Sequence, residues 1–222
     1  MSLIKKLLGN NRPSNKETKS RNAPGSKSKS CKCPYCGTLL EKKPARKKKC
    51  SNCGNYIFVR KGRLLTEDQK AVEEWLDSLA MFDVTEQTFN RHRKQLSKQF
   101  GSQPSVNDTV WRVLNSLVAS TTDHSRAKLI YSEMAHLVRG EGKDPKPYLA
   151  KAAKQELLDM KESGISRVCV YTSNDDLVCS KCRALARKTF TIDQALRDMP
   201  IPNACDNDED GCRCWYSAVV DF

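Results

Sequence analysis

Long apolar runs, histidines and glycine-rich loops are scarce in this chain of 222 residues. No apolar run reaches the length of about 18 residues that a transmembrane helix needs, so we expect no contact with a membrane. The first residues carry a short apolar patch that Lys5 and Lys6 interrupt, and no apolar segment follows it. We therefore expect no secretory signal and a cytoplasmic location, in a bacterium or a phage-infected cell. No glycine-rich loop of the phosphate-binding kind occurs.

The scarcity of histidine limits the catalytic options. His92, His124 and His136 all fall in predicted helices, away from the cysteines. Cys169 lies in an apolar strand, which favours an inert buried thiol over a nucleophile. A metal-dependent nuclease is a further hypothesis, without a carboxylate motif to support it. Its candidate ligands are Asp175, Asp176 and Asp193. The sequence thus does not indicate catalysis.

Positive charge is abundant but confined to one part of the chain. Residues 1–63 contain 18 Lys and Arg against two acidic residues, a net charge of +16, whereas the whole chain has +13 and the remainder therefore −3. Such asymmetry indicates a localised anionic partner, and nucleic acid is the partner that we expect. A tail that only increases solubility is the alternative.

Eleven cysteines are present, and they are clustered. In an intracellular chain, paired Cys-x-x-Cys units indicate metal binding rather than disulfides. Thirteen residues separate the first two pairs, whose members are Cys33, Cys36, Cys50 and Cys53. Gly37 and Gly54 follow the pairs, where a knuckle often needs a positive φ angle. The spacing predicts one zinc ion held by four thiolates. Cys31 is a spare thiol and an alternative ligand.

The segment between these pairs, residues 42–49, is here called the basic finger, because six of its eight residues are cationic. They are Lys42, Lys43, Arg46, Lys47, Lys48 and Lys49. Tyr56 and Phe58 follow the second pair, and after them come Arg60, Lys61 and Arg63. Cations interleaved with aromatics suit phosphate contacts and base stacking, with weak sequence preference, on DNA or RNA. Two alternatives stay open: the rings form the ribbon's own core, or the ribbon docks on an acidic protein.

A second group of cysteines lies near the end of the sequence. Its members are Cys179, Cys182, Cys205, Cys212 and Cys214. Five thiols compete for four positions around a second zinc ion, and we favour the first four, with Cys214 as the substitute. Strands before and after this group would bring its ends together. A site of four thiolates has no open position for water, so we expect a structural role.

The predicted fold class is α+β, with about five helices in the centre. Thr66 is a helix N-cap with Gln69 as its capping-box partner, and further helices run from Thr85 to Gly101 and from Tyr148 to Met160. The apolar stripes of these helices predict a core. The expected domains are a disordered basic arm (1–30), a zinc ribbon (31–64), a helical domain (65–164) and a C-terminal cysteine-rich zinc module (165–222).

The C-terminal module resembles a known motif over residues 165–218. The motif residues are Cys179-Ser-Lys-Cys182-Arg-Ala-Leu185, then Phe190, Ile192, Pro200-Ile-Pro202 and Cys212-Arg-Cys214. Together they look like the end of the Mu-F-like head-morphogenesis proteins of tailed phages. This resemblance implies a minor capsid-like component, preceded by helices and acting through a phage-derived or capsid-like partner. The family usually has His-Pro before the last motif, where this chain offers Cys205. The basic ribbon is not usual there, so a prophage-derived protein in another role fits equally.

Overall fold

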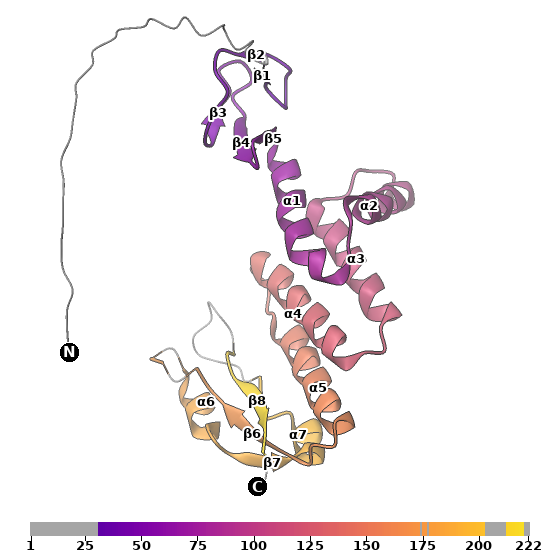
Figure 1. Ribbon diagram of the computed structural model, residues 1–222, viewed down its shortest axis with the longest axis vertical. Coiled ribbons are helices and arrows are strands. Elements are labelled where there is room, and N and C mark those ends of the chain that lie inside the picture. The colour runs from indigo at the N-terminus through magenta and orange to yellow at the C-terminus, as the bar shows by residue number, and fades with distance from the viewer. Residues whose placement is uncertain (1–30, 174, 177, 203–211, 220–222) are drawn as a thin grey trace, which may run out of the picture.

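The computed structural model describes residues 31–173, 175–176, 178–202 and 212–219, and Figure 1 shows the arrangement of their elements. The predicted α+β class is confirmed, because helices and small antiparallel sheets follow one another along the chain. The expected arm at 1–30 and Cys205 lie outside the described residues. No helix in the described ranges has both the length and the hydropathy of a membrane span.

The N-terminal ribbon consists of two small antiparallel sheets. Its strands are β1 (Cys31–Lys32), β2 (Leu39–Leu40), β3 (Lys48–Lys49), β4 (Tyr56–Arg60) and β5 (Arg63–Leu65). β1 pairs with β2, and β4 lies between β3 and β5. Three side chains form the buried centre, namely Cys33, Cys50 and Ile57. A core of this size is too small to stabilise a fold without a metal or another cross-link.

Five α-helices form the middle of the molecule. They are α1 (Glu67–Leu79), α2 (Glu86–Phe100), α3 (Val106–Ser120), α4 (His124–Gly140) and α5 (Lys146–Glu162), with a 3₁₀ turn, η1 (Ala80–Phe82), after α1. The predicted capping box of Thr66 and Gln69 is confirmed, as is the stop at Gly101, whose φ angle is 68°. Leu79, Phe89 and Leu114 are buried in the core that these helices share.

The helix α5 begins at Lys146, two residues before the predicted start at Tyr148. Pro145 and Pro147 suggested that the chain stays irregular up to this point. A proline is tolerated in the first helical turn, because the N–H that it lacks would have no partner there. The prolines therefore belong to the beginning of α5 rather than to a break before it.

The C-terminal module is a three-stranded antiparallel sheet with two short helices. Its elements are β6 (Arg167–Tyr171), α6 (Ser180–Leu185), β7 (Thr189–Thr191), α7 (Ile192–Asp198) and β8 (Trp215–Ala218), in the strand order β7-β6-β8. The pairing of β6 with β8 confirms that the two flanking strands bring the ends of the cysteine segment together. Leu157 of α5 is fully buried in the core of this sheet, next to Val168 and Tyr216. The helix α5 therefore packs both against the other helices and against the C-terminal sheet.

A chain that starts at Thr66 is expected to fold without the ribbon. Neither of the two larger buried clusters contains a residue from before Thr66. The ribbon contacts α1 through ion pairs, of which those to Asp77 are exposed and contribute little to stability, whereas Glu73 is only 13% exposed. Thermal unfolding followed by circular dichroism should show one cooperative transition. Aggregation of the truncated chain would mean that the ribbon covers apolar surface that α1 needs to bury.

Candidate metal centres and the basic ribbon surface

Two equivalent loops present the four N-terminal cysteines. In each loop the N–H of the glycine donates to the carbonyl of the first cysteine, Gly37 to Cys33 at 2.9 Å and Gly54 to Cys50 at 3.0 Å. Both glycines have a φ angle of 73°, as the sequence predicted, and a side chain would be strained there. The loops therefore have the same geometry, although their side chains differ.

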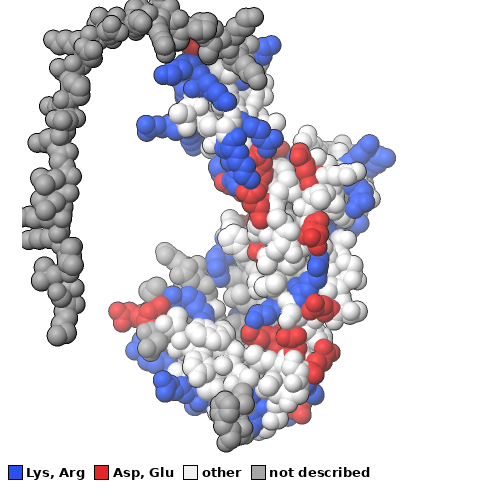
Figure 2. Space-filling view, in the orientation of Figure 1, with Lys and Arg blue, Asp and Glu red and all other residues white. Residues whose placement is uncertain are grey.

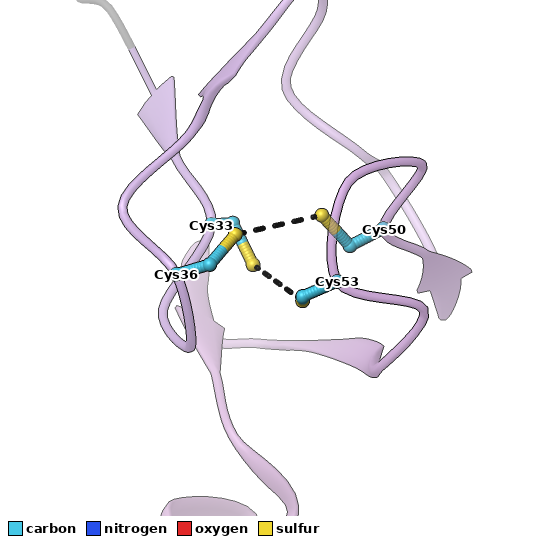
Figure 3. Close-up of side chains that lie close together, drawn as sticks. All are labelled: Cys33, Cys36, Cys50 and Cys53. Atoms are coloured by element: carbon cyan, nitrogen blue, oxygen red, sulfur yellow. Dashed lines mark hydrogen bonds between the residues drawn. The ribbon is translucent and has the colours of Figure 1, made fainter.

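The four sulfur atoms of these loops point toward one another (Figure 3). All four lie within 4.8 Å of each other. The Sγ atoms of Cys33 and Cys53 are 3.9 Å apart, and so are those of Cys36 and Cys50. Tetrahedral zinc with Zn–S bonds of about 2.3 Å requires sulfur–sulfur distances of about 3.8 Å. The donor set thus fits a tetrahedral metal ion in number, chemistry and spacing.

Hydrogen bonds favour the ionised form of two of the four sulfurs, whereas burial and the neighbouring thiols raise the pKa of Cys53 to about 11. The side chain and the backbone N–H of Thr38, together with the amide of Asn52, lower the pKa of Cys36 to about 5. The backbone N–H groups of Cys53 and Asn52 likewise lower the pKa of Cys50. A metal ion binds the thiolate rather than the thiol. Side-chain and backbone hydrogen bonds within the loops therefore favour the thiolate at two of the four candidate ligands.

A second cysteine cluster lies between α6 and β8. The Sγ atoms of Cys182, Cys212 and Cys214 all lie within 4.8 Å of one another, and those of Cys182 and Cys212 are 3.7 Å apart. Burial and a hydrogen bond to Cys182 raise the pKa of Cys214 far above its ordinary value in the absence of a metal. Cys214, predicted only as the substitute ligand, thus belongs to the group that the fold brings together.

Cys179 lies beside this cluster. It is the N-cap of α6, and its Sγ accepts the backbone N–H of Cys182 at 3.3 Å. It is buried, with an exposed fraction of 7%. Cys205 lies outside the described residues, so its role as a ligand stays a prediction. Cys31 and Cys169 belong to neither group of clustered sulfurs.

The basic finger carries six exposed cations, the residues predicted to bind phosphate. Within the described part of the chain, none of them forms an ion pair with a carboxylate. Figure 2 shows Lys and Arg gathered over the ribbon, with acidic side chains on the helices next to it. The positive charge of the finger is therefore available to an external anion.

Arg60, Lys61 and Arg63 lie in a different environment. Arg60 contacts Asp77 at 2.6 Å and Glu74 at 3.2 Å, and Lys61 contacts Asp77 at 3.0 Å. Arg63 pairs with Glu73, another residue of α1. Hydrogen bonds from Lys61 and Arg60 hold the pKa of Asp77 below its usual range. These three cations attach the ribbon to α1, and their predicted contact with nucleic acid stays a prediction.

The two aromatic residues of β4 lie outside the ribbon core. Ile57 is fully buried, whereas Tyr56 is 50% exposed and Phe58 is half-buried. The ammonium of Lys47 lies 4.4 Å from the ring centre of Tyr56 and 4.9 Å from that of Phe58. The buried cluster contains neither ring, which argues against the interpretation that the two rings form the ribbon's own core.

The carboxylates of the nuclease hypothesis do not converge among the described residues. Asp175 pairs with Arg213 at 2.6 Å, and Asp193 pairs with Lys161 at 2.7 Å. Neither belongs to a group of side chains that could hold a metal ion. The described part of the chain thus provides two sulfur-rich candidate sites and no acidic one.

Comparisons with family models, curated proteins and solved structures found no match to this chain. The functional argument therefore rests on the chemistry of the sites. Sequence reasoning missed the acidic face of α1 that holds the ribbon, although Glu73 and Asp77 are spaced four residues apart and lie on one side of a predicted helix.

Proposed function

We propose that this protein is a non-catalytic zinc protein that binds nucleic acid through its basic ribbon. Its cysteine clusters could hold metal ions, and donor sets made only of thiolates favour zinc. In the N-terminal site the four sulfurs fill the tetrahedron and leave no position for a reacting water. Zinc there would connect the two loops and so fix the base of the basic finger.

The observation that carries the proposal is the contrast between two sets of cations. The six cations of the finger are exposed and have no carboxylate partner in the described ranges, whereas Arg60, Lys61 and Arg63 are neutralised by α1. A dense row of unpaired cations is unfavourable unless an anion neutralises it. The phosphodiester backbone of a nucleic acid carries the complementary negative charge.

A second candidate is a structural component, similar to a phage head protein, that acts through protein contacts. The motif of the C-terminal module supports it, and so does one surface feature. Tyr171 and Trp215 are stacked, with ring centres 6.1 Å apart, and both rings are more than 40% exposed. Exposed aromatic residues are frequent in protein interfaces. The experiment below separates the two candidates.

Replacing all six cations of the finger by Ala is expected to abolish tight binding of nucleic acid. The variant keeps every cysteine, so its metal content and fold should not change. Affinity should fall for all sequences alike. The log–log salt dependence should become shallower by about 0.9 for each phosphate of duplex DNA that the variant no longer neutralises. Fluorescence anisotropy of a labelled oligonucleotide, measured over a range of salt concentrations, gives both quantities.

The control removes three exposed cations from the helical region instead. Arg91, Lys94 and Lys98 of α2 are exposed and unpaired in the described part of the chain, and their replacement by Ala should leave affinity nearly unchanged. If the finger variant binds as well as the wild type while its metal content is intact, the nucleic-acid proposal is wrong. The protein-contact candidate then takes its place.

A further inference from the structure

The strand β4 presents an aromatic surface beside the basic finger. Side chains alternate between the two faces of a strand, so Tyr56 and Phe58 share the face opposite to buried Ile57. Lys49 pairs with Tyr56 across the sheet and lies on the same face. With Lys47 above both rings, two cations and two aromatic rings form one continuous patch, here called the aromatic strip.

A duplex would use only part of this surface. In double-stranded nucleic acid the faces of the bases are stacked on one another, so an aromatic ring of the strip would find no free base face to stack on. A single strand offers phosphates and unstacked bases together, and proteins that bind single strands combine a cationic groove with aromatic side chains. Tyr56, half exposed and next to unpaired cations, has the properties of such a stacking residue.

We propose that the ligand of the ribbon is single-stranded nucleic acid, with a base stacked on Tyr56 and the flanking phosphates held by the basic finger. This inference rests on the proposed function and specifies its substrate class. DNA and RNA share the chemistry that the strip recognises, an unpaired base on a phosphodiester chain. The same patch gives no reason to bind an acidic protein, which would need the cations but not the rings.

Lys47 occupies the ring face in the free protein, and its displacement is favourable. A cation over an aromatic ring at an exposed site stabilises by a factor of about 2 to 5 in equilibrium constant. A base stacked on an aromatic ring is worth about 5- to 150-fold. A base that replaces Lys47 therefore stabilises the complex more than the cation stabilised the free protein. The released ammonium, on a flexible side chain, then lies close to the phosphate of the stacked nucleotide.

The test uses the full chain with its metal and four labelled probes of about 12 nucleotides, a length within the usual site size of single-strand binders. The probes are oligo(dT), oligo(U), a strand with the same phosphates but no bases, and a DNA duplex. Wild-type protein should bind both base-containing strands more tightly than the strand without bases. Tyr56→Ala should weaken binding to these two by about tenfold. It should change affinity for the duplex and for the strand without bases less than about twofold.

Tyr56→Phe keeps the ring and should retain the affinity of the wild type, which separates stacking from loss of the hydroxyl. Leu39→Ala, at a residue of β2 that is 61% exposed, controls for general damage to the ribbon surface. Equal binding of oligo(dT) and oligo(U) means that the strip senses neither the 2′-hydroxyl nor the 5-methyl group, and unequal binding means that it senses one of them. Either result supports the inference.

Two outcomes overturn it. If the strand without bases binds as tightly as oligo(dT), or if Tyr56→Ala weakens every probe alike, the aromatic strip does not read unpaired bases. The proposed function survives both outcomes, because the finger variant tests it separately. If no probe binds to the wild type, the proposed function itself fails, and the inference fails with it.

Discussion

Protein purified without added metal is expected to contain about two zinc ions per chain, and Cys50→Ser should remove one of them. Cys50 is 3% exposed and lies in the centre of the ribbon, so its sulfur is both a candidate ligand and part of the core. Structural zinc contributes about 10–16 kcal/mol in zinc-finger peptides at neutral pH. The ribbon has too little apolar surface to fold without it. We therefore expect the ribbon of this variant to be unfolded. Elemental analysis counts the zinc ions, and NMR of the ribbon amides shows whether the ribbon is folded.

The control for this substitution is Cys31→Ser. Cys31 precedes the first loop and lies outside the group of four sulfurs, so its replacement should leave two zinc ions and a folded ribbon. A wild-type value near one ion per chain would remove the C-terminal site. A value near zero would contradict the metal assignment as a whole. Loss of metal in the Cys31 variant would show that this thiol is a ligand after all.

Local chemistry accounts for the parts of the fold that the sequence predicted. Thr66 and Gln69 form their capping box because only neighbouring residues take part in it. The two glycine-ended cysteine loops follow in the same way from spacing and from the need for a positive φ angle. The strands β6 and β8 are apolar enough to be recognised in isolation. Each of these features depends on a few residues that are close in the sequence.

The elements that the sequence did not predict are short or depend on distant partners. The helices α6 and α7 have six and seven residues, too few for a helical repeat to be visible. The capping box of Thr191 with Gln194 was the signal that could have revealed α7. The ion pairs of the ribbon with α1, by contrast, arise only when β5 leads directly into the helix. No pattern within the ribbon itself could have assigned Arg60 to Glu74 and Asp77.

The helix α5 also depends on distant partners, because its two faces pack against different parts of the molecule. One of its faces contacts α4, where Ser125 donates to Asp159 at 3.0 Å and His124 is hydrogen-bonded to Gln155 at 2.6 Å. Its other face provides Leu157, which is fully buried against β6 and β8. The predicted boundary at residue 164 therefore separates the C-terminal sheet from a helix that fills its core.

Leu157→Ala is expected to destabilise the protein by about 3 kcal/mol, because truncation of a fully buried leucine loses transfer free energy and leaves a cavity. The loss should be concentrated in the C-terminal module. Its metal should therefore be released to a chelator faster than in the wild type, while the N-terminal site is unaffected. Urea unfolding measures the free energy, and a chromogenic chelator follows the two metal ions separately.

Leu129→Ala is the matched control, since it removes the same atoms from a leucine on α4 that is 42% exposed. It should cost no more than about 0.5 kcal/mol and leave both metals bound. Equal costs for the two substitutions would mean that Leu157 is not part of the core of the sheet. If Leu157→Ala is destabilising but both metals stay equally inert, the C-terminal cluster does not depend on the packing of α5. The cysteine loop would then hold its metal as an independent unit, as the ribbon is expected to do.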